Sequence, residues 1–195
     1  LPAEKVNIDS DARQIATISC GEFESTLIGI SAEEYPDLPS VSGGYPISVK
    51  QETLKDMIRK TIFSAAVKDT NIVHTGIKFE IEHNHIRLIA VDGVRLAIRN
   101  EDINYEGENL SFVVPAKTLS EVLKLMNDDE ADVVLGVGKR HIIFEIKGYN
   151  IISRLLDGEF LNYKAAIPSS TKTVINVNTR SLIDSIDRTS LIITD

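Results

Sequence analysis

The chain has 195 residues, of which 43% are hydrophobic and 26% are charged, and its formal net charge is −8. This length accommodates one or two domains, and the apolar share is large enough for a packed core, which excludes a disordered polyelectrolyte. No apolar run approaches the roughly 18 residues that cross a bilayer, so we expect no membrane-spanning segment. The net negative charge argues against a protein that binds nucleic acid through its total charge alone. Basic residues gathered on one face would still allow nucleic-acid binding.

A single cysteine, Cys20, excludes an internal disulfide framework and a cysteine-based zinc site. The opening residues, Leu1-Pro2-Ala3-Glu4, have neither the basic start nor the apolar stretch of a secretory signal, and they lack an initiator Met. We therefore expect a reduced, cytoplasmic globular protein in which residue 1 is not the natural start.

Most of the chain alternates apolar and polar residues with period two and is rich in β-branched side chains, which is typical of half-buried strands. In chain order the predicted strands are 47–49, 77–81, 86–91, 94–98, 111–114, 132–135, 141–146 and 150–155. Three segments instead have a helical period: 52–66, 118–127, and a helix that begins near Thr179. The mixture predicts an α+β fold with antiparallel sheets.

The chain resembles itself when it is shifted by 128 positions without gaps. This register pairs Ile15 with Ile143, and it continues through the first and third helices, where Leu54 pairs with Leu182. A weaker half-period of 65 pairs Val49 with Val114 at the start of the first two helices. The pattern predicts a unit of one strand, one helix and several strands that is used twice per domain. We expect residues 1–42 to end one copy, 43–168 to form a complete domain, and 169–195 to begin another.

The outer faces of the first two helices carry several basic residues. An ordinary solvated helix surface would also be charged, so this feature alone does not establish a site. Because the two helices occupy the same position in the repeat, we expect them to lie side by side and to form one basic stripe, which suits a phosphate backbone. The stripe consists of Lys55, Arg59, Lys60, Lys117 and Lys124, and we expect Asp128, Asp129, Glu130 and Asp132 at its edges.

Candidate catalytic and metal-binding residues are few. Asp92 and Asp157 are each followed by glycine, so a turn in which the carboxylate caps its own backbone is the simpler interpretation. His83 and His85 lie in a polar turn without an acid-rich ligand set around them. We find no catalytic centre and expect neither a metal nor another cofactor.

Three motifs together resemble one family. The stretch Ala90-Val-Asp-Gly-Val-Arg-Leu-Ala97 is similar to the Thr-Asp-Gly-His-Arg-Leu-Ala signature of the bacterial sliding clamp, the beta subunit of DNA polymerase III. The segment from Ser153 to Tyr163 resembles the Leu-x-Asp-Gly-x-Phe-Pro-x-Tyr segment of that family, and Glu33 to Pro39 resembles the equivalent segment of its first domain. The resemblance implies a DNA clamp fold, with the end of the first domain, the whole second domain and the start of the third.

The resemblance also implies a function without catalysis. Two clamp protomers close head to tail into a ring around double-stranded DNA, which they hold without regard to sequence, and helices line the hole. The ring tethers the polymerase III alpha subunit as a processivity factor and also binds the clamp loader. The stripe would then face DNA, joined by Lys68 after the first helix. Because ring closure uses the first and third domains, we expect this 195-residue chain alone not to close a ring.

The family's second site is a shallow apolar pocket that binds extended peptide motifs of partner proteins. The positions that match it here are His74, Val91, Gly93, Val94, Arg95, Leu96, Leu161, Ala165 and Ala166. The family's usual threonine, histidine, leucine and proline are replaced here by Val91, Val94, His74 and Leu161, which changes the shape of the pocket. Two alternatives stay open: a peptide-binding module that does not encircle DNA, and a hydrolase that uses Asp92 or Asp157.

Overall fold

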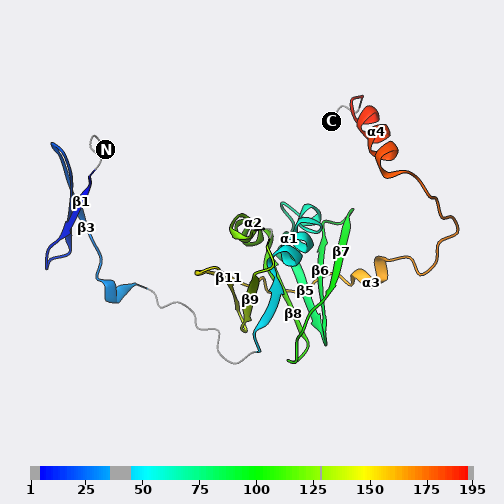
Figure 1. The fold of residues 1–195 in the computed structure, drawn as a ribbon, viewed down its shortest axis with the longest axis horizontal. Coiled ribbons are helices and arrows are strands. Elements are labelled where there is room, and N and C mark those ends of the chain that lie inside the picture. Colours follow the sequence, from blue (N-terminus) through cyan, green and yellow to red (C-terminus); the bar gives the residue numbers. More distant parts are fainter. Residues whose placement is uncertain (1–4, 36–44, 128, 193–195) are drawn as a thin grey trace.

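The computed structural model describes residues 5–35, 45–127 and 129–192 of the chain. Its strands are β1 (Asn7–Ser10), β2 (Ile15–Cys20), β3 (Phe23–Ile28), β4 (Ile47–Lys50), β5 (Gly76–Glu82), β6 (His85–Val91), β7 (Leu96–Asp102), β8 (Leu110–Pro115), β9 (Asp132–Val137), β10 (His141–Ile146) and β11 (Tyr149–Arg154). Its α-helices are α1 (Gln51–Arg59), α2 (Ala116–Leu125), α3 (Tyr163–Ala166) and α4 (Thr179–Ser190), and short 3-10 turns η1 (Ala32–Glu34), η2 (Ile62–Ser64) and η3 (Ile72–Thr75) lie between them. The α+β prediction is confirmed (Figure 1).

The central body consists of two units with the same element order. Each unit is one strand, one helix and three strands: β4-α1-β5-β6-β7 and then β8-α2-β9-β10-β11. One antiparallel sheet has the order β11-β10-β9-β4 and the other has the order β7-β6-β5-β8. Each unit therefore places its first strand in the sheet of the other unit. This exchange interlocks the two halves, so neither sheet is complete without both.

Both helices of the body lie side by side on one side of the sheets (Figure 1). They enclose a core of fully buried side chains that includes Leu54 and Met57 from α1, and Leu119 and Val122 from α2. The sheets contribute aromatic side chains, and the rings of Phe79 and Phe112 stack with centroids 5.3 Å apart. This burial is the main stabilising contribution in a domain of this kind.

The two helices begin in the same way. The residue before α1 is Lys50 and the residue before α2 is Pro115, and both have extended backbone (φ −58°, ψ 137° and φ −54°, ψ 132°). Pro115 is separated from Lys50 by the half-period of 65 that the sequence predicts. The proline fits here because the first helical N–H groups have no partner within their own helix.

The predicted ends of the first two helices were wrong. The first helix stops at Arg59 rather than 66, because buried Thr61 leaves the helical conformation (φ −123°, ψ −36°) and its hydroxyl donates to the carbonyls of Met57 and Ile58. Such a hydroxyl competes with the helix's own hydrogen bonds. The second helix begins two residues earlier than predicted, directly after Pro115, and ends at Leu125 because Met126 is extended.

The predicted strand 94–98 begins later, at Leu96. The reason is a tight turn in which the N–H groups of Val94 and Arg95 donate to Asp92 Oδ1 at 3.3 and 3.0 Å. Gly93 has φ +87°, which glycine adopts without the strain that a Cβ would bring. The prediction that Asp92 caps its own backbone is confirmed.

The repeat of 128 is confirmed at the helices but not in the preceding hairpin. Helix α4 begins at Thr179, 128 positions after the start of α1 at Gln51. At the hairpin tips, however, Cys20 pairs with Phe23 and Ile146 pairs with Tyr149, which is an offset of 126. The ungapped pairing of Ile15 with Ile143 was therefore wrong by two positions, because the spacing between hairpin and helix differs between the copies.

The segments before and after the body bury little of their apolar surface. The sheet β1-β2-β3 exposes Ile8, Leu27 and Ile28, and α4 contains no buried residue. Figure 1 shows both segments standing apart from the body. Among the described residues, no helix is both long and apolar enough to cross a membrane.

Candidate functional site

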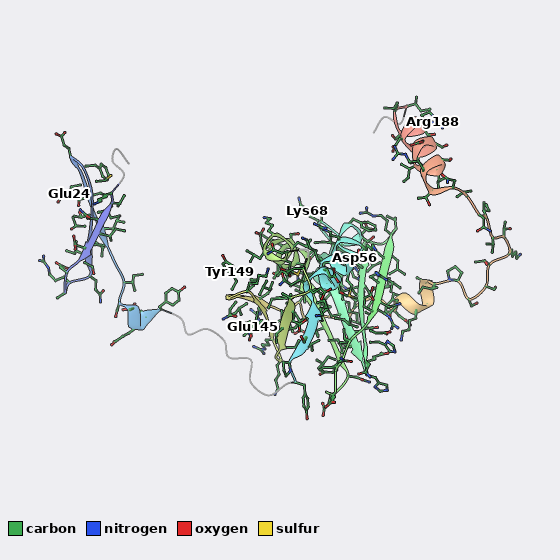
Figure 2. All side chains as sticks on the ribbon, viewed as in Figure 1. Glu24, Asp56, Lys68, Glu145, Tyr149 and Arg188 are labelled. Carbon is green, nitrogen blue, oxygen red and sulfur yellow. The ribbon has the colours of Figure 1, made fainter. Side chains whose placement is uncertain are left out.

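The basic residues predicted on the helical face are mostly exposed. Arg59 and Lys60 end α1, and Lys117 and Lys124 lie on α2. Lys68 follows the first helix and lies on the same side of the body as the two helices (Figure 2). Four of these five cations thus lie on or directly after the two helices, and Lys68 lies on the same side of the body.

Two of these cations are neutralised by neighbours. Lys60 Nζ lies 2.8 Å from Asp56 Oδ1, one helical turn away, and this bond is the main reason that the pKa of Asp56 lies below its ordinary value. Lys124 Nζ lies 2.8 Å from Glu121 Oε1. Arg59, Lys68 and Lys117 form no ion pair within the part of the chain that the structure describes. These three residues, which we call the open cations, are the ones available to an external anion.

Lys55 does not lie on the outer face as the sequence predicted. It is only 7% exposed, and its positive charge contributes to lowering the pKa of Asp129. The main cause of that lowered pKa is Lys147, whose ammonium donates to the Asp129 carboxylate. The helical period alone does not predict this burial, because the burial depends on neighbouring elements that pack around α1.

Three of the four acids predicted at the edge of the stripe lie within the described residues. Asp129 and Asp132 are both engaged with lysines, since Asp132 Oδ1 lies 3.7 Å from Lys50 Nζ. Lys50 Nζ also donates to the carbonyl of Glu130 at 2.9 Å. Asp128 lies outside the described residues.

The turn between β6 and β7 contains five of the nine residues predicted for the peptide pocket. Val91 is buried, Leu96 is half-buried, and Val94 is 91% exposed at the tip beside Gly93. Arg95 donates from Nε and Nη2 to Asp92 Oδ2 at 2.8 and 2.5 Å, which is the main cause of the lowered pKa of Asp92. The exposed guanidinium is therefore held against its own turn.

His74 and Leu161 lie in one hollow of about 290 Å³, which Asn71 and Phe160 also line. The His74 ring meets the edge of the Phe160 ring with centroids 5.7 Å apart. Its Nδ1 lies 3.0 Å from Asp69 Oδ2, and Asn71 Nδ2 donates to the carbonyl of Glu159 at 3.0 Å. The pKa of Asp69 lies below its ordinary value because the backbone N–H of Asn71 donates to it and, secondarily, because of His74. These contacts join η3 to the segment that leads into α3.

Helix α3 is fixed to the sheet through Tyr163. Its hydroxyl donates to Glu80 Oε2 at 2.7 Å, and Arg87 Nη1 donates to the same carboxylate at 3.2 Å. Lys78 Nζ lies 2.7 Å from Glu80 Oε1 and 5.6 Å from the centroid of the Phe160 ring. Burial of Glu80 raises its pKa, but the bonds from Lys78, Tyr163 and Arg87 together outweigh burial and bring the pKa below its ordinary value. We call Lys78, Glu80, Arg87 and Tyr163 the α3 latch.

The predicted pocket residues therefore form three groups, of which the first is the set of five at the β6–β7 turn. His74 and Leu161 share a hollow, whereas Ala165 and Ala166 are exposed on α3, whose hydrogen bonds to the sheet run to the middle of β5 and β6 rather than to the β6–β7 turn. Sequence reasoning missed the α3 latch and the ring contact of Phe160. The available signal was the polar residues alternating along β5 and β6, which stand on one face of the sheet.

Asp92 and Asp157, the two carboxylates considered for catalysis, each precede a glycine with positive φ. No group of three or more His, Cys, Asp or Glu residues within the described ranges is placed to hold a metal ion. Asp92 is occupied by its own turn and by Arg95. Asp157 precedes Gly158, whose φ of +146° again suits a glycine turn.

The interlocked units with paired helices define a DNA clamp fold, and comparisons with known proteins agree. The family model of the DNA polymerase III beta subunit, central domain, matches residues 48–162. The beta sliding clamp of Bacillus subtilis is 32% identical over 193 residues, which covers 98% of this chain and 51% of that protein. The chain belongs to the DNA polymerase III beta subunit family, and it spans about half the length of the curated relatives it matches.

Solved structures show the same fold. A DNA polymerase sliding clamp from Bacillus subtilis aligns over 100% of this chain and 52% of its own, with a TM-score of 0.88 and 31% identity. A DNA polymerase III beta subunit from Thermotoga maritima aligns over 98% of this chain and 52% of its own, with a TM-score of 0.78 and 28% identity. The alignments include β1–β3 and α4, so these segments also have counterparts in the clamp structures.

Proposed function

We propose that this protein is a DNA sliding clamp, a non-catalytic processivity factor that encircles duplex DNA as a head-to-tail ring of two protomers and tethers the replicative polymerase. The observation that carries the proposal is the helical layer. Helices α1 and α2 begin at equivalent repeat positions, lie side by side and carry the open cations Arg59 and Lys117, and the third open cation, Lys68, follows α1 on the same side of a chain of net charge −8. Family membership supports the same function.

The weak charge of this surface suits sliding. A ring is retained on DNA by its topology, so the helices need only solvated, salt-sensitive contacts with phosphates. Pairing of Lys60 with Asp56 and of Lys124 with Glu121 limits the strength of those contacts. Tight binding to phosphates would slow movement along the duplex.

We also propose the three-part division of the chain at 42/43 and 168/169. The element order supports it, since the first unit begins with β4 at Ile47 and α3 ends at Ala166. The boundary at 42/43 itself lies outside the described residues, as do Pro36 to Pro39 of the motif that resembles the end of the first domain.

The decisive test is retention on DNA of different topology. The full-length protein, loaded on nicked circular DNA with a clamp loader, should stay bound in gel filtration at physiological salt and should be released when the DNA is linearised. The 195-residue chain alone should not be retained on either DNA. Equal retention of the full-length protein on circular and linear DNA would contradict encirclement and favour ordinary binding.

The helical face has its own test. In the full-length protein, Arg59→Gln, Lys68→Gln and Lys117→Gln together should weaken binding to short linear duplex. The slope of log affinity against log salt should fall by about one for each phosphate contact removed. Lys139→Gln, Arg140→Gln and Arg154→Gln together give a matched control with three exposed cations outside the helices. An equal change in both variants would exclude a DNA site centred on α1 and α2.

We further propose that the β6–β7 turn, η3 and α3 form the pocket for partner peptides. Half-buried Leu96 offers an apolar wall, and His74 with Leu161 lines a hollow. A fluorescent Gln-Leu-x-Leu-Phe-type peptide should bind the full-length protein saturably, and Leu96→Ala should weaken it by about 1 kcal/mol or more. Saturable binding that Leu96→Ala leaves unchanged would place the peptide elsewhere.

A further inference from the structure

A second groove opens between the outer edge of β8 and the segment that follows β11. It encloses about 600 Å³ and is lined by basic residues from three places: Lys78 on β5, Lys139 and Arg140 in the β9–β10 turn, and Arg154 at the end of β11. Buried Phe112 and half-buried Phe160 form apolar parts of the wall. The groove is thus amphipathic and has most of its cations at one end of the sheet β9–β11.

The cations of this groove are available to a ligand. Lys139, Arg140 and Arg154 are exposed and form no ion pair within the described residues, whereas Lys78 is paired with Glu80. The chain as a whole has a net charge of −8, so three unpaired cations in one groove are a local reversal of charge. Such a reversal attracts anionic groups and gives an interface its specificity.

The edge of β8 adds a second kind of recognition. The N–H of Leu156 donates to the carbonyl of Val113 at 2.9 Å, so this carbonyl points away from β5 and toward the groove. Peptide groups alternate in direction along an antiparallel strand, so Ser111, two residues earlier, turns its N–H and carbonyl to the same edge. Ser111 lines the groove, and these backbone groups have no hydrogen-bond partner in the described part of the chain. An unpaired strand edge is a template for an added strand.

We propose that this groove binds an acidic, extended peptide segment of a partner protein. The segment pairs its backbone with the edge of β8 at Ser111 and places carboxylates against Lys139, Arg140 and Arg154. Asp157 and Glu159 also line the groove and repel such a segment, which restricts its carboxylates to the end that holds the three cations. The site goes beyond the proposed function, since neither DNA retention nor the apolar pocket requires it. Because Glu159 and Phe160 line both hollows, one partner peptide can occupy the two sites in succession.

The test uses the full-length protein and a short fluorescein-labelled peptide that alternates glutamate with threonine. At low salt the peptide should bind saturably. Lys139→Gln, Arg140→Gln and Arg154→Gln together should weaken it roughly tenfold or more, since an interface depends on its close charge pairs. Glu159→Gln, which removes a repulsive charge, should instead tighten binding. Methylation of alternate backbone nitrogens of the peptide should weaken binding by a similar factor, because it blocks the added strand.

Three controls make the result specific. The variant Arg59→Gln, Lys68→Gln and Lys117→Gln, which removes as many cations from the helical face, should change peptide binding by less than about twofold. A peptide with lysine in place of glutamate should not bind. The groove variant should still be retained on nicked circular DNA, so failure of the clamp proposal and failure of this one can be told apart. Absence of saturable binding, equal losses in the two triple variants, or indifference to backbone methylation would overturn the proposal.

Discussion

The helices α1 and α4 occupy equivalent positions in the repeat but have very different surroundings. Leu54 and Ile58 of α1 are 0% exposed, whereas their counterparts in α4, Leu182 and Ile186, are 47% and 57% exposed. The residue types are the same, so the difference comes from what packs against each helix. Helix α1 lies on two sheets and beside α2, while α4 stands apart from the body (Figure 1). An amphipathic helix supplies an apolar face, but its stabilisation depends on the layer that covers it.

The largest expected effect contrasts the two equivalent leucines. In this chain Leu54→Ala should lower the free energy of unfolding of the central body by about 2–5 kcal/mol, because it leaves a cavity in a packed core. Leu182→Ala should change it by no more than about 0.5 kcal/mol, since the side chain is already half-exposed. Urea denaturation of both variants measures the contrast. Similar losses would show that α4 packs on the body in solution.

The next effect concerns Glu80 in the α3 latch. Glu80→Gln should destabilise the body by about 2 kcal/mol at neutral pH, because it removes an ionised acceptor of several hydrogen bonds. Since the folded-state pKa of Glu80 lies below the ordinary value, the ionised carboxylate stabilises the fold above the unfolded pKa, which is about 4.3. That stabilisation is lost as the pH falls through the folded pKa.

The pH dependence of the urea midpoints distinguishes the contribution of the Glu80 charge from a general destabilisation of the fold by acid. The wild-type chain and Glu80→Gln should differ most near neutral pH and should converge on acidification below about pH 4. A difference that stays constant as the pH falls well below that value would mean that the charge of Glu80 contributes nothing and that the substitution acts through packing alone.

A smaller effect is expected from the hydroxyl of the latch. Tyr163→Phe removes the donor to Glu80 but keeps the ring, so it should cost about 1 kcal/mol. It should also loosen α3 without unfolding the sheets, which hydrogen exchange of the α3 amides would detect. Unchanged exchange would show that other contacts of the helix, rather than the latch, hold α3 in place.

The smallest effect returns to α4. Asn178 caps this helix by accepting from the N–H of Ser181 at 3.1 Å. Asn178→Ala should destabilise α4 by the usual capping contribution of about 1 kcal/mol and so lower its helix content. It should leave the free energy of unfolding of the body unchanged. Chemical shifts of the α4 residues measure the first effect and urea denaturation the second. A shifted urea midpoint would again indicate that α4 is coupled to the body.

The repeat made the architecture predictable, because two copies of one pattern confirmed each other. The starts of α1, α2 and α4 follow from it to within two residues. The end of α1 did not, since Thr61 ends the helix through a hydroxyl bond that a hydrophobic period ignores. The strand predicted to begin at Val94 begins at Leu96 instead, because the N–H groups of Val94 and Arg95 donate to Asp92 Oδ1 in the turn.

The sites were less predictable than the fold, because they depend on contacts between distant segments. The sequence singles out Lys55 as an outer-face residue, but its exposure is decided by neighbouring elements. The contact of His74 with Phe160 and the latch between Glu80 and Tyr163 each join residues that lie far apart in the chain. No local pattern specifies such pairs, whereas the turn around Asp92 is local and was predicted.

The proposed function requires that the layer of α1 and α2 faces DNA. The most direct measurement is photo-crosslinking from single sites of the full-length protein loaded on nicked circular DNA, with a cysteine-reactive photoprobe on Arg59→Cys, Lys117→Cys or Lys139→Cys. Cys20 is 1% exposed, so it should contribute little labelling. We expect crosslinks to DNA from positions 59 and 117 and none from 139. Crosslinks from 139 alone, or from all three equally, would contradict it.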